Sequence, residues 1–493
     1  MAGNMKIGLK RDNKIENKQA TSSTKTIAFW YVASNLLVSG FSIITTPIFT
    51  RILTKTEVGN FGNFTAWFSI LTILVTLNLY STIARAKYDF NEEMDQYLSS
   101  ILILTNLVTL AFYLVVELFS PFFIGFFSME IRYIRILFVY LLFSPAFTFL
   151  QMKLRIYKQF KFVVFFSIFS SVMNVLVSIT LVLLLENKFM GRVLGTVAPI
   201  TSLNILIWIY IMWKGRSFSF RYVKYALLIS VPLIPHALAG NLLNTSDRVM
   251  IKQICGAEDA AIYSIAYTTS MLVQILWSSM NQAWSPWLFD HIFQKDYVKI
   301  KEKSRLYLLL FMGIAMGIML VVPEVILVMA GAKYAAAKYV MPPVIVGMVF
   351  QFVYSMYVNL EMYQKKTIMI SFGTLGAAAI NIGLNYLLIP KFGYIAAAYT
   401  TLVGYACLML FHFFIVKLSH EFDGIYDDKF HFAMLGLIFV FHLLCMYLYQ
   451  FVLIRYVVVV IYGFVLMGIA YKYRDNLLFF LKKVPKKKKE EKL

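Results

Sequence analysis

The sequence predicts an all-α integral membrane protein with about 14 transmembrane helices. Of its 493 residues, 60% are hydrophobic and only 14% are charged, whereas soluble domains average about 25% charged residues. Apolar runs of about 20 residues, the length needed to cross the hydrocarbon of a bilayer, recur along the whole chain. A soluble protein is excluded, because single soluble cores stop growing near about 250–300 residues and could not cover this much apolar surface.

Fourteen apolar runs are separated by short polar segments. They cover residues 27–50, 62–84, 99–118, 133–151, 162–185, 193–213, 226–247, 259–284, 306–323, 339–360, 367–389, 394–416, 433–452 and 453–471. The first run is too long for a signal-peptide core and lacks a small-residue cleavage site, so it is expected to stay in the membrane. Only Arg455 marks the turn between the last two runs.

The basic residues predict the orientation of these spans. The net charge is +21, and 34 of the 46 Lys and Arg residues fall in the N-terminus, the even-numbered loops and the C-terminus. The side richer in Lys and Arg faces the cytoplasm, so both termini of a multi-pass protein of the cytoplasmic membrane are expected there. The basic run 486–489 would then face anionic lipid head groups, and no nucleic-acid partner is predicted. The three cysteines lie far apart, so neither a disulfide framework, a metal site nor a cofactor is predicted.

Two internal matches predict a repeat. Gly191, before the sixth run, aligns with Gly393, before the twelfth, at an offset of 202 residues, and Arg51 aligns with Arg248 at an offset of 197. We therefore expect two six-helix lobes in a parallel pseudo-repeat, with two further C-terminal helices and a substrate site between the lobes. The expected domains are a basic cytoplasmic arm (1–26), an N-lobe (27–220), a C-lobe (221–420), and the last two spans with a basic cytoplasmic tail (421–493).

Polar stripes on the first and seventh runs predict surfaces turned away from lipid, because polar groups facing hydrocarbon are costly. The first run places Asn35 and four Ser or Thr side chains within an arc of about 80°. They either pack against another helix or line a cavity. In the seventh run, His236, Asn244 and Asp247 share a face that predicts a wet cavity. The alternatives are an ion pair between Asp247 and an arginine that fixes the helix end, and a hydrogen-bonded core role for His236.

The eighth run has one face on which aromatic and polar side chains are mixed. Its members include Tyr263, Tyr267, Gln274, Trp277 and Asn281, at spacings of three, four or seven residues. Such faces suit sugar rings, which stack on aromatic side chains while their hydroxyl groups form hydrogen bonds. The alternative is that the aromatic residues mark the membrane interface.

Three arginines at the ends of runs are candidate ligands for an anionic head group. Arg51 and Arg248 end the first and seventh runs on the expected outer side, and Arg85 ends the second on the cytoplasmic side. The planar guanidinium group binds phosphate oxygens in a bidentate manner. The alternative for each is a cation that extends to the membrane interface. The carboxylates considered for ion coupling are Glu117 and Asp247.

Motifs of the main enzyme classes are missing. The chain has no G-x-x-x-x-G-K-S/T phosphate loop, no H-E-x-x-H and no G-x-S-x-G. No polar segment is long enough for a soluble catalytic domain. Enzyme chemistry would therefore have to come from short loops, and an enzyme is not predicted.

The chain resembles the Wzx-type polysaccharide repeat-unit flippases of the multidrug/oligosaccharidyl-lipid/polysaccharide (MOP) exporter superfamily. The segments that carry the resemblance are 47–54, 58–61, 232–236, 247–248, 282–287 and 381–393. The resemblance implies a V-shaped molecule of two six-helix lobes around a central cationic cavity. It also implies transfer of an undecaprenyl-pyrophosphate-linked oligosaccharide from the cytoplasmic to the outer leaflet by alternating access. Arg51 and Arg248 match positions at which the family carries a basic residue, and Arg85 is a further match.

The same resemblance implies partners. These are the lipid-linked oligosaccharide, membrane lipid, and the polysaccharide polymerase and chain-length regulator of an assembly machinery. Three other functions stay open from the sequence. A small-molecule exporter of the superfamily would need buried acidic residues at mid-membrane, in which this chain is poor. A lipid II flippase shares the architecture. A membrane-embedded polymerase or glycosyltransferase would need a long outer loop with clustered Arg, Asp or His, which the segments 119–132 and 324–338 lack.

Overall fold

The computed structural model describes residues 45–157, 159–364 and 366–472. Within these ranges the chain is almost entirely helical and contains no strand. Twelve helices are long and apolar enough to cross a membrane, and a shorter apolar helix, Val452–Gly468, follows them. They correspond to the second to fourteenth predicted spans, so the all-α membrane fold is confirmed. The predicted first span, 27–50, and with it Asn35, lies outside the described residues except for its helical end.

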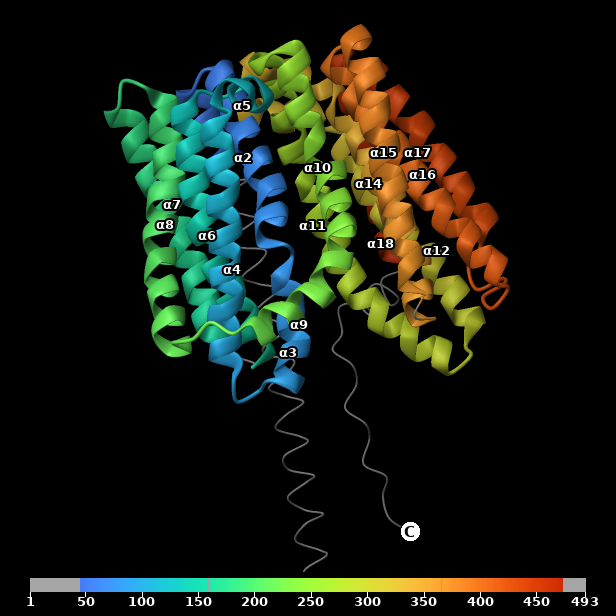
Figure 1. The fold of residues 1–493 in the computed structure, drawn as a ribbon. Helices are drawn as coiled ribbons and strands as arrows, with labels where there is room; N and C mark the ends of the chain where they lie inside the picture. The colour runs from blue at the N-terminus through green and yellow to red at the C-terminus, as the bar shows by residue number, and fades with distance from the viewer. Residues whose placement is uncertain (1–44, 158, 365, 473–493) are drawn as a thin grey trace, which may run out of the picture.

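The first group of helices, at left in Figure 1, contains five helices of membrane-spanning length. In chain order, its elements are α2 (Lys55–Thr76), η1 (Leu79–Thr82), α3 (Ile83–Asp89), α4 (Met94–Leu118), α5 (Ser120–Phe127), α6 (Ile131–Ile156), α7 (Phe160–Leu184), α8 (Lys188–Gly215) and α9 (Phe220–Ser230). Thr54 and Glu57 form a capping box that fixes the start of α2. The short helix α9 belongs to this group by packing, since it contacts α4 and η1.

The chain passes to the second group at a 3-10 turn, η2 (Val231–Leu233). Pro232 and Pro235 lie at the first positions of η2 and of the next helix. Proline has no N–H to donate, so the predicted seventh span is divided into two helices. The second group consists of α10 (Ile234–Cys255), α11 (Ala257–Phe293), α12 (Tyr297–Leu320), α13 (Val322–Ala330), η3 (Ala332–Tyr339), α14 (Met341–Tyr363), α15 (Thr367–Phe392), α16 (Tyr394–Ser419), α17 (Asp428–Leu448) and α18 (Val452–Lys472).

The same packing recurs in both groups. α8 packs on α6 and α7 in the first group, as α16 packs on α14 and α15 in the second. The short helix α5 lies between α4 and α6, and α13 lies between α12 and α14. Gly195 explains the close contact in the first group, because a Cβ there would lie 2.3 Å from the Cα of Ser178 in α7. These contacts agree with two similar halves, while the domain boundaries inferred from the sequence stay predictions.

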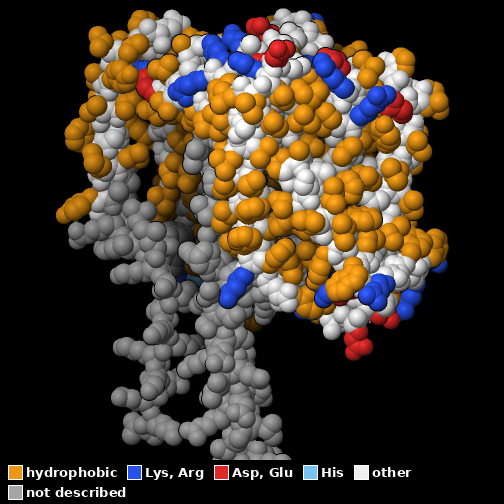
Figure 2. All heavy atoms as spheres, turned by 90° about the vertical axis from the view of Figure 1, so that its left-hand side faces the viewer, with side chains coloured by type: hydrophobic (Ala, Val, Ile, Leu, Met, Phe, Trp, Pro, Cys, Tyr) orange, Lys and Arg blue, Asp and Glu red, His pale blue; other side chains and the backbone are white. Residues whose placement is uncertain are grey.

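The outer surface of the bundle is divided into an apolar middle and two charged ends. Figure 2 shows the left side of Figure 1, where hydrophobic side chains cover the middle and charged side chains gather toward the two ends. Apolar side chains of α4 and α7 such as Leu114 and Phe165 are about two-thirds exposed. Exposed apolar surface of this extent is stable only in lipid. We call the end that carries α5 the α5 end, and the end that carries α3 and α9 the α9 end (Figure 1).

Candidate functional site

The two groups are joined at the α5 end by side chains that donate to backbone carbonyls. The segment before α2 contacts α13 and η3, and the end of α10 contacts the end of α5. The hydrogen bonds are Arg51 Nη2 to Val328 O (3.1 Å), Thr50 Oγ1 to Met329 O (3.1 Å), Lys333 Nζ to Leu53 O (2.6 Å), Lys252 Nζ to Ser128 O (2.6 Å) and Gln253 Nε2 to Phe126 O (2.7 Å). We call this set of five bonds the α5-end contact.

Four of the five acceptors of the α5-end contact lie at the C-terminal ends of helices α13 and α5. Val328 and Met329 lie in the last turn of α13, and Phe126 and Ser128 lie at the end of α5. The last four carbonyls of a helix have no partner within the helix, and the helix dipole makes that end attractive to cations. Three of the five donors are Lys or Arg. The contact therefore supplies hydrogen-bond donors to unpaired carbonyls and positive charge to the negative ends of the helix dipoles.

Beside this contact, α2 and α11 approach each other at backbone distance. A Cβ added at Gly59 would lie 1.8 Å from the carbonyl oxygen of Ala257, and one added at Gly62 would lie 2.8 Å from Ser264 Oγ. Real Cβ atoms essentially never approach another heavy atom within 3.0 Å. Gly59 is therefore required for the groups to meet in this arrangement, because its neighbour is backbone, whereas the Ser264 hydroxyl opposite Gly62 is able to rotate away.

Asp247 lies in a buried polar network within the second group. Its side chain is 1% exposed. Its carboxylate accepts hydrogen bonds from Thr401 Oγ1 (2.6 Å), from Asn385 Nδ2 (2.6 Å) and from the Tyr263 hydroxyl. These donors come from α16, α15 and α11, so the carboxylate ties α10 to three other helices. No arginine forms an ion pair with it in the part of the chain described here.

Asn244 has a similar position one turn away. Its Oδ1 accepts hydrogen bonds from Tyr267 Oη (2.9 Å) and from Tyr405 Oη (2.7 Å). In this conformation the polar atoms of both Asn244 and Asp247 are thus occupied by neighbouring helices. Their assignment to a head-group site stays a prediction, and it requires that these helices move apart.

The predicted sugar-binding face of α11 is also turned into the second group. Besides Tyr263 and Tyr267, two of its members bond to α14. Trp277 Nε1 donates to Ser355 Oγ (3.1 Å), and Asn281 Oδ1 accepts from Asn359 (2.9 Å). Gln274 is half-buried. The sequence pattern identified a true helix face, and its role in sugar contact stays a prediction.

Arg248 differs from these residues, because its guanidinium forms no salt bridge among the described residues, although the neighbouring Asp247 carboxylate interacts with it electrostatically. The guanidinium lies 4.9 Å from the ring centroid of Tyr267. Its Nε is buried and has no hydrogen-bond partner within the ranges described. A half-buried guanidinium with an unsatisfied donor is able to bind an anion.

None of the remaining predicted residues forms a hydrogen bond or ion pair with Arg248 in the described ranges. Arg51 is exposed and belongs to the α5-end contact. The Arg85 side chain is 74% exposed on α3 at the α9 end, and its Nε lies 3.8 Å from Asp89. His236 is half-buried in the first turn of α10, with Nδ1 unpaired among described groups. Glu117 forms a surface ion pair with Arg135. The structure thus does not bring the three predicted arginines into one cluster in this conformation.

Sequence reasoning missed Arg192. Its guanidinium lies 3.7 Å from the ring centroid of Phe49 and 4.3 Å from that of Phe61. It donates to Ser178 Oγ (2.8 Å) and Thr196 Oγ1 (3.2 Å), and no described carboxylate pairs with it. The predicted sixth span began at residue 193, so Arg192 was counted with a loop. The helix α8 in fact begins at Lys188, so Arg192 lies within the helix. Its side chain is enclosed because it packs against Phe49 and Phe61.

Comparisons with known proteins agree on the architecture. The family described as "Polysaccharide biosynthesis protein" matches residues 26–291. The structure is similar to "Lipid II flippase MurJ, inward closed conformation", with a TM-score of 0.68, 16% identity, and coverage of 92% of this chain and 99% of that one. It is also similar to inward-facing and outward-facing structures of a multidrug resistance MATE family transporter of the MOP superfamily. Their TM-scores are 0.56 and 0.52 at 14% and 16% identity, over 77% and 79% of this chain and 94% of each of theirs. A search of curated proteins finds no match.

Proposed function

Because this chain belongs to the polysaccharide biosynthesis protein family of MOP-superfamily flippases, we propose that it transfers a lipid-linked oligosaccharide repeat unit across the cytoplasmic membrane. The cargo we propose is an undecaprenyl-pyrophosphate-linked oligosaccharide. Arg248 is the observation that carries the proposal. A half-buried guanidinium that forms no salt bridge in the described chain and keeps an unsatisfied Nε fits a pyrophosphate, which offers several anionic oxygens to a bidentate donor.

The α5-end contact supports the proposed direction of transfer. We propose that the α5 end faces outward, as the distribution of Lys and Arg in the sequence predicts. The structure then represents a state closed on the outer side, in which the cargo has access from the cytoplasm. Release requires that the five hydrogen bonds of the contact break while α10 and α11 move away from α2. Cargo drives this change only if it binds one state more tightly than the other.

A flippase for lipid II is the second candidate, because the MurJ structure covers 92% of this chain. Both cargoes would present a polyprenyl pyrophosphate to Arg248, so the arginine does not distinguish them. The sugars do. The face of α11 with Trp277 and Asn281 would meet the first sugars once its bonds to α14 open.

The test uses the full chain in vesicles that contain a fluorescent polyprenyl-pyrophosphate oligosaccharide or fluorescent lipid II, and it measures the fraction of each lipid in each leaflet. Arg248→Ala is expected to reduce transfer at least tenfold, and Arg248→Lys to restore part of it, since charge survives without the bidentate geometry. Arg132→Ala is the matched control, because Arg132 is an exposed cation paired with Glu130. Normal transfer by Arg248→Ala would refute the role of Arg248, and transfer of lipid II alone would favour the second candidate.

A further inference from the structure

A carboxylate and an imidazole are buried together in the second group, remote in sequence from the Asp247 network. Glu361 in α14 and His412 in α16 are each 0% exposed. His412 Nδ1 lies 2.6 Å from Glu361 Oε1. The predicted span 339–360 ends one residue before Glu361, which would place this carboxylate in a loop. The helix in fact continues to Tyr363, so a carboxylate lies inside a membrane-spanning helix.

Each member of this pair keeps one polar atom without a hydrogen bond among the described residues. These atoms are Glu361 Oε2 and His412 Nε2. No Lys or Arg forms an ion pair with Glu361 in the described ranges. α15 closes the site with Gly373, where a Cβ would lie 2.5 Å from His412 Nε2. The glycine therefore leaves just enough room for the imidazole and none for a larger neighbour.

The surroundings of the pair supply few other charges. On α14 itself Tyr354 faces it, with its ring 5.0 Å from the imidazole, and Tyr405 of α16 lies near Tyr354 in the same apolar cluster. α15 presents Gly373 and Thr374, which do not titrate. From α17, Asp428 and His431 contact α14 one turn away, at Tyr357.

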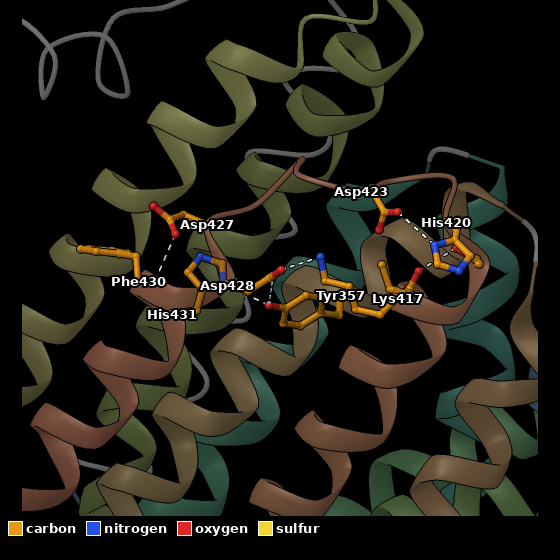
Figure 3. Close-up of polar contacts among 10 residues, drawn as sticks. Tyr357, Lys417, His420, Asp423, Asp427, Asp428, Phe430 and His431 are labelled. Carbon is orange, nitrogen blue, oxygen red and sulfur yellow. Dashed lines mark hydrogen bonds and ion pairs between the residues drawn. The ribbon is translucent and has the colours of Figure 1, made fainter.

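These contacts of α17 connect α14 with the surface of the α9 end. Tyr357 Oη donates to Asp428 Oδ1 (3.0 Å) and lies 3.3 Å from His431 Nδ1. Asp428 is paired with Lys417 (2.5 Å), and both side chains are partly exposed. Figure 3 shows Tyr357, Asp428 and Lys417 directed toward one another between α14, α16 and α17. A row of titratable groups thus runs from the surface to within one helical turn of Glu361.

The net charge of the Glu361–His412 pair depends on how many protons it holds. With one shared proton, it is either a carboxylate beside an imidazolium or a carboxylic acid beside a neutral imidazole, and its net charge is zero in both forms. With two protons its charge is +1, and with none it is −1. An uncompensated charge in a buried site is strongly unfavourable. The pair therefore gains or loses a proton only when α14, α15 and α16 rearrange so that water or another charge reaches it.

We propose that the Glu361–His412 pair is a proton-binding site whose change of protonation is coupled to the rearrangement of α14 and α16. Reciprocal coupling follows, because a proton that binds one arrangement more tightly shifts the population toward it. The pair would allow a proton gradient to bias the cycle of a protein that has no phosphate loop. The inference rests on the geometry of the second group and does not depend on which lipid is the cargo.

The first test detects the proton directly. Infrared difference spectra of the full chain in vesicles, recorded between about pH 5 and pH 9 without cargo, are expected to show the titration of a buried carboxyl group. The band should vanish in Glu361→Gln and shift in pH in His412→Gln. Both substitutions keep a polar side chain of similar size. Glu117→Gln, which alters the exposed carboxylate of α4, is the matched control and should keep the band. A band that persists unchanged in Glu361→Gln would overturn the proposal.

The second test measures coupling, also without cargo. Spin labels at Thr56 and Glu258, two exposed positions on either side of the α5-end contact, report the separation of the two groups. Wild type is expected to change its distance distribution with pH, and Glu361→Gln and His412→Gln should reduce that change at least threefold. If both variants fold, as thermal unfolding would show, and retain the wild-type pH response, the pair is not coupled. Since no lipid-linked oligosaccharide is present, a failure of the proposed cargo leaves this result intact.

Discussion

Substitution of Gly59 is the sharpest test of the closed α5 end. A Cβ at this position would lie 1.8 Å from Ala257 O, and contacts under 3.0 Å do not occur. In Gly59→Val, α2 and α11 must therefore separate by more than 1 Å, because the atoms that face the new side chain belong to the backbone of Ala257 and cannot rotate away. Overpacking of this kind costs about 1–3 kcal/mol. That cost falls on the closed state alone, so the equilibrium between closed and open should shift by about 5- to 150-fold.

The assay is the distance between spin labels at Thr56 and Glu258, measured in a background in which the three native cysteines are replaced. Gly59→Val is expected to lengthen the distance distribution and to slow lipid transfer, because a state closed at the α5 end is needed in each cycle. Gly59→Ala should produce a smaller change in the same direction. The matched control is Gly436→Val, since nothing lies within 4 Å of a Cβ added at Gly436.

One result would refute the reasoning. If Gly59→Val had the wild-type distance distribution and the wild-type transfer rate, the close approach of α2 to α11 would not hold the groups together. The contact between the groups would then depend on the five side-chain hydrogen bonds alone, and Lys333→Met or Arg51→Met should open it.

Three further predictions concern single polar groups. Asp247→Ala removes three buried hydrogen bonds and should lower stability by about 3 kcal/mol in thermal unfolding; unchanged unfolding with impaired transfer would instead indicate a direct role with the cargo. Arg192→Gln should lower transfer more than Arg192→Lys in the leaflet assay, because a lysine keeps the charge between the two phenyl rings; equal transfer by both variants would argue for packing only. Arg455→Met should cost about 1–2 kcal/mol, because Arg455 is 3% exposed and pairs with Glu324. Burial raises the pKa of Glu324, but the hydrogen bonds from Arg455 and Tyr456 outweigh it and hold the pKa below its usual value. The stabilisation that ionised Glu324 gains from Arg455 is fully present above the ordinary carboxyl pKa of 4.5, and it is lost as the pH falls through the lower pKa of the folded state. The unfolding curves of wild type and Arg455→Met should therefore converge in acid.

The sequence predicted the spans well because hydropathy alone decides which segments enter a bilayer. Nine of the thirteen spans after the first begin and end within five residues of the helices found, and two of the errors have clear physical causes. α11 runs to Phe293, past the predicted end at residue 284, since a helix continues into water without any change in its backbone. The seventh span contains a break because its prolines lack N–H donors, and a hydropathy window averages over them.

The site was harder to predict, because a stripe on a helix does not reveal what it faces. Asp247 and Tyr263 lie on the stripes that the periodicity predicted and bond to each other, yet the other partners of Asp247 lie on α15 and α16, at residues 385 and 401. Glu361 and Arg192 escaped attention because each is charged and lies at the edge of an apolar run, where sequence reading assigns a loop. Only packing shows that both are enclosed. The partner of Glu361, His412, is 51 residues away in the chain.

The acceptors of the α5-end contact are carbonyl groups of the main chain, and several belong to apolar residues such as Val328, Met329 and Phe126. An amino-acid substitution cannot delete a carbonyl. The acceptor side of this junction should therefore tolerate almost any residue compatible with a helix end, and evolutionary drift there would leave the junction intact. Only the donors need to be retained or exchanged for one another. Related chains could thus diverge widely at the acceptor positions, and carry apolar residues there, without losing the ability to close.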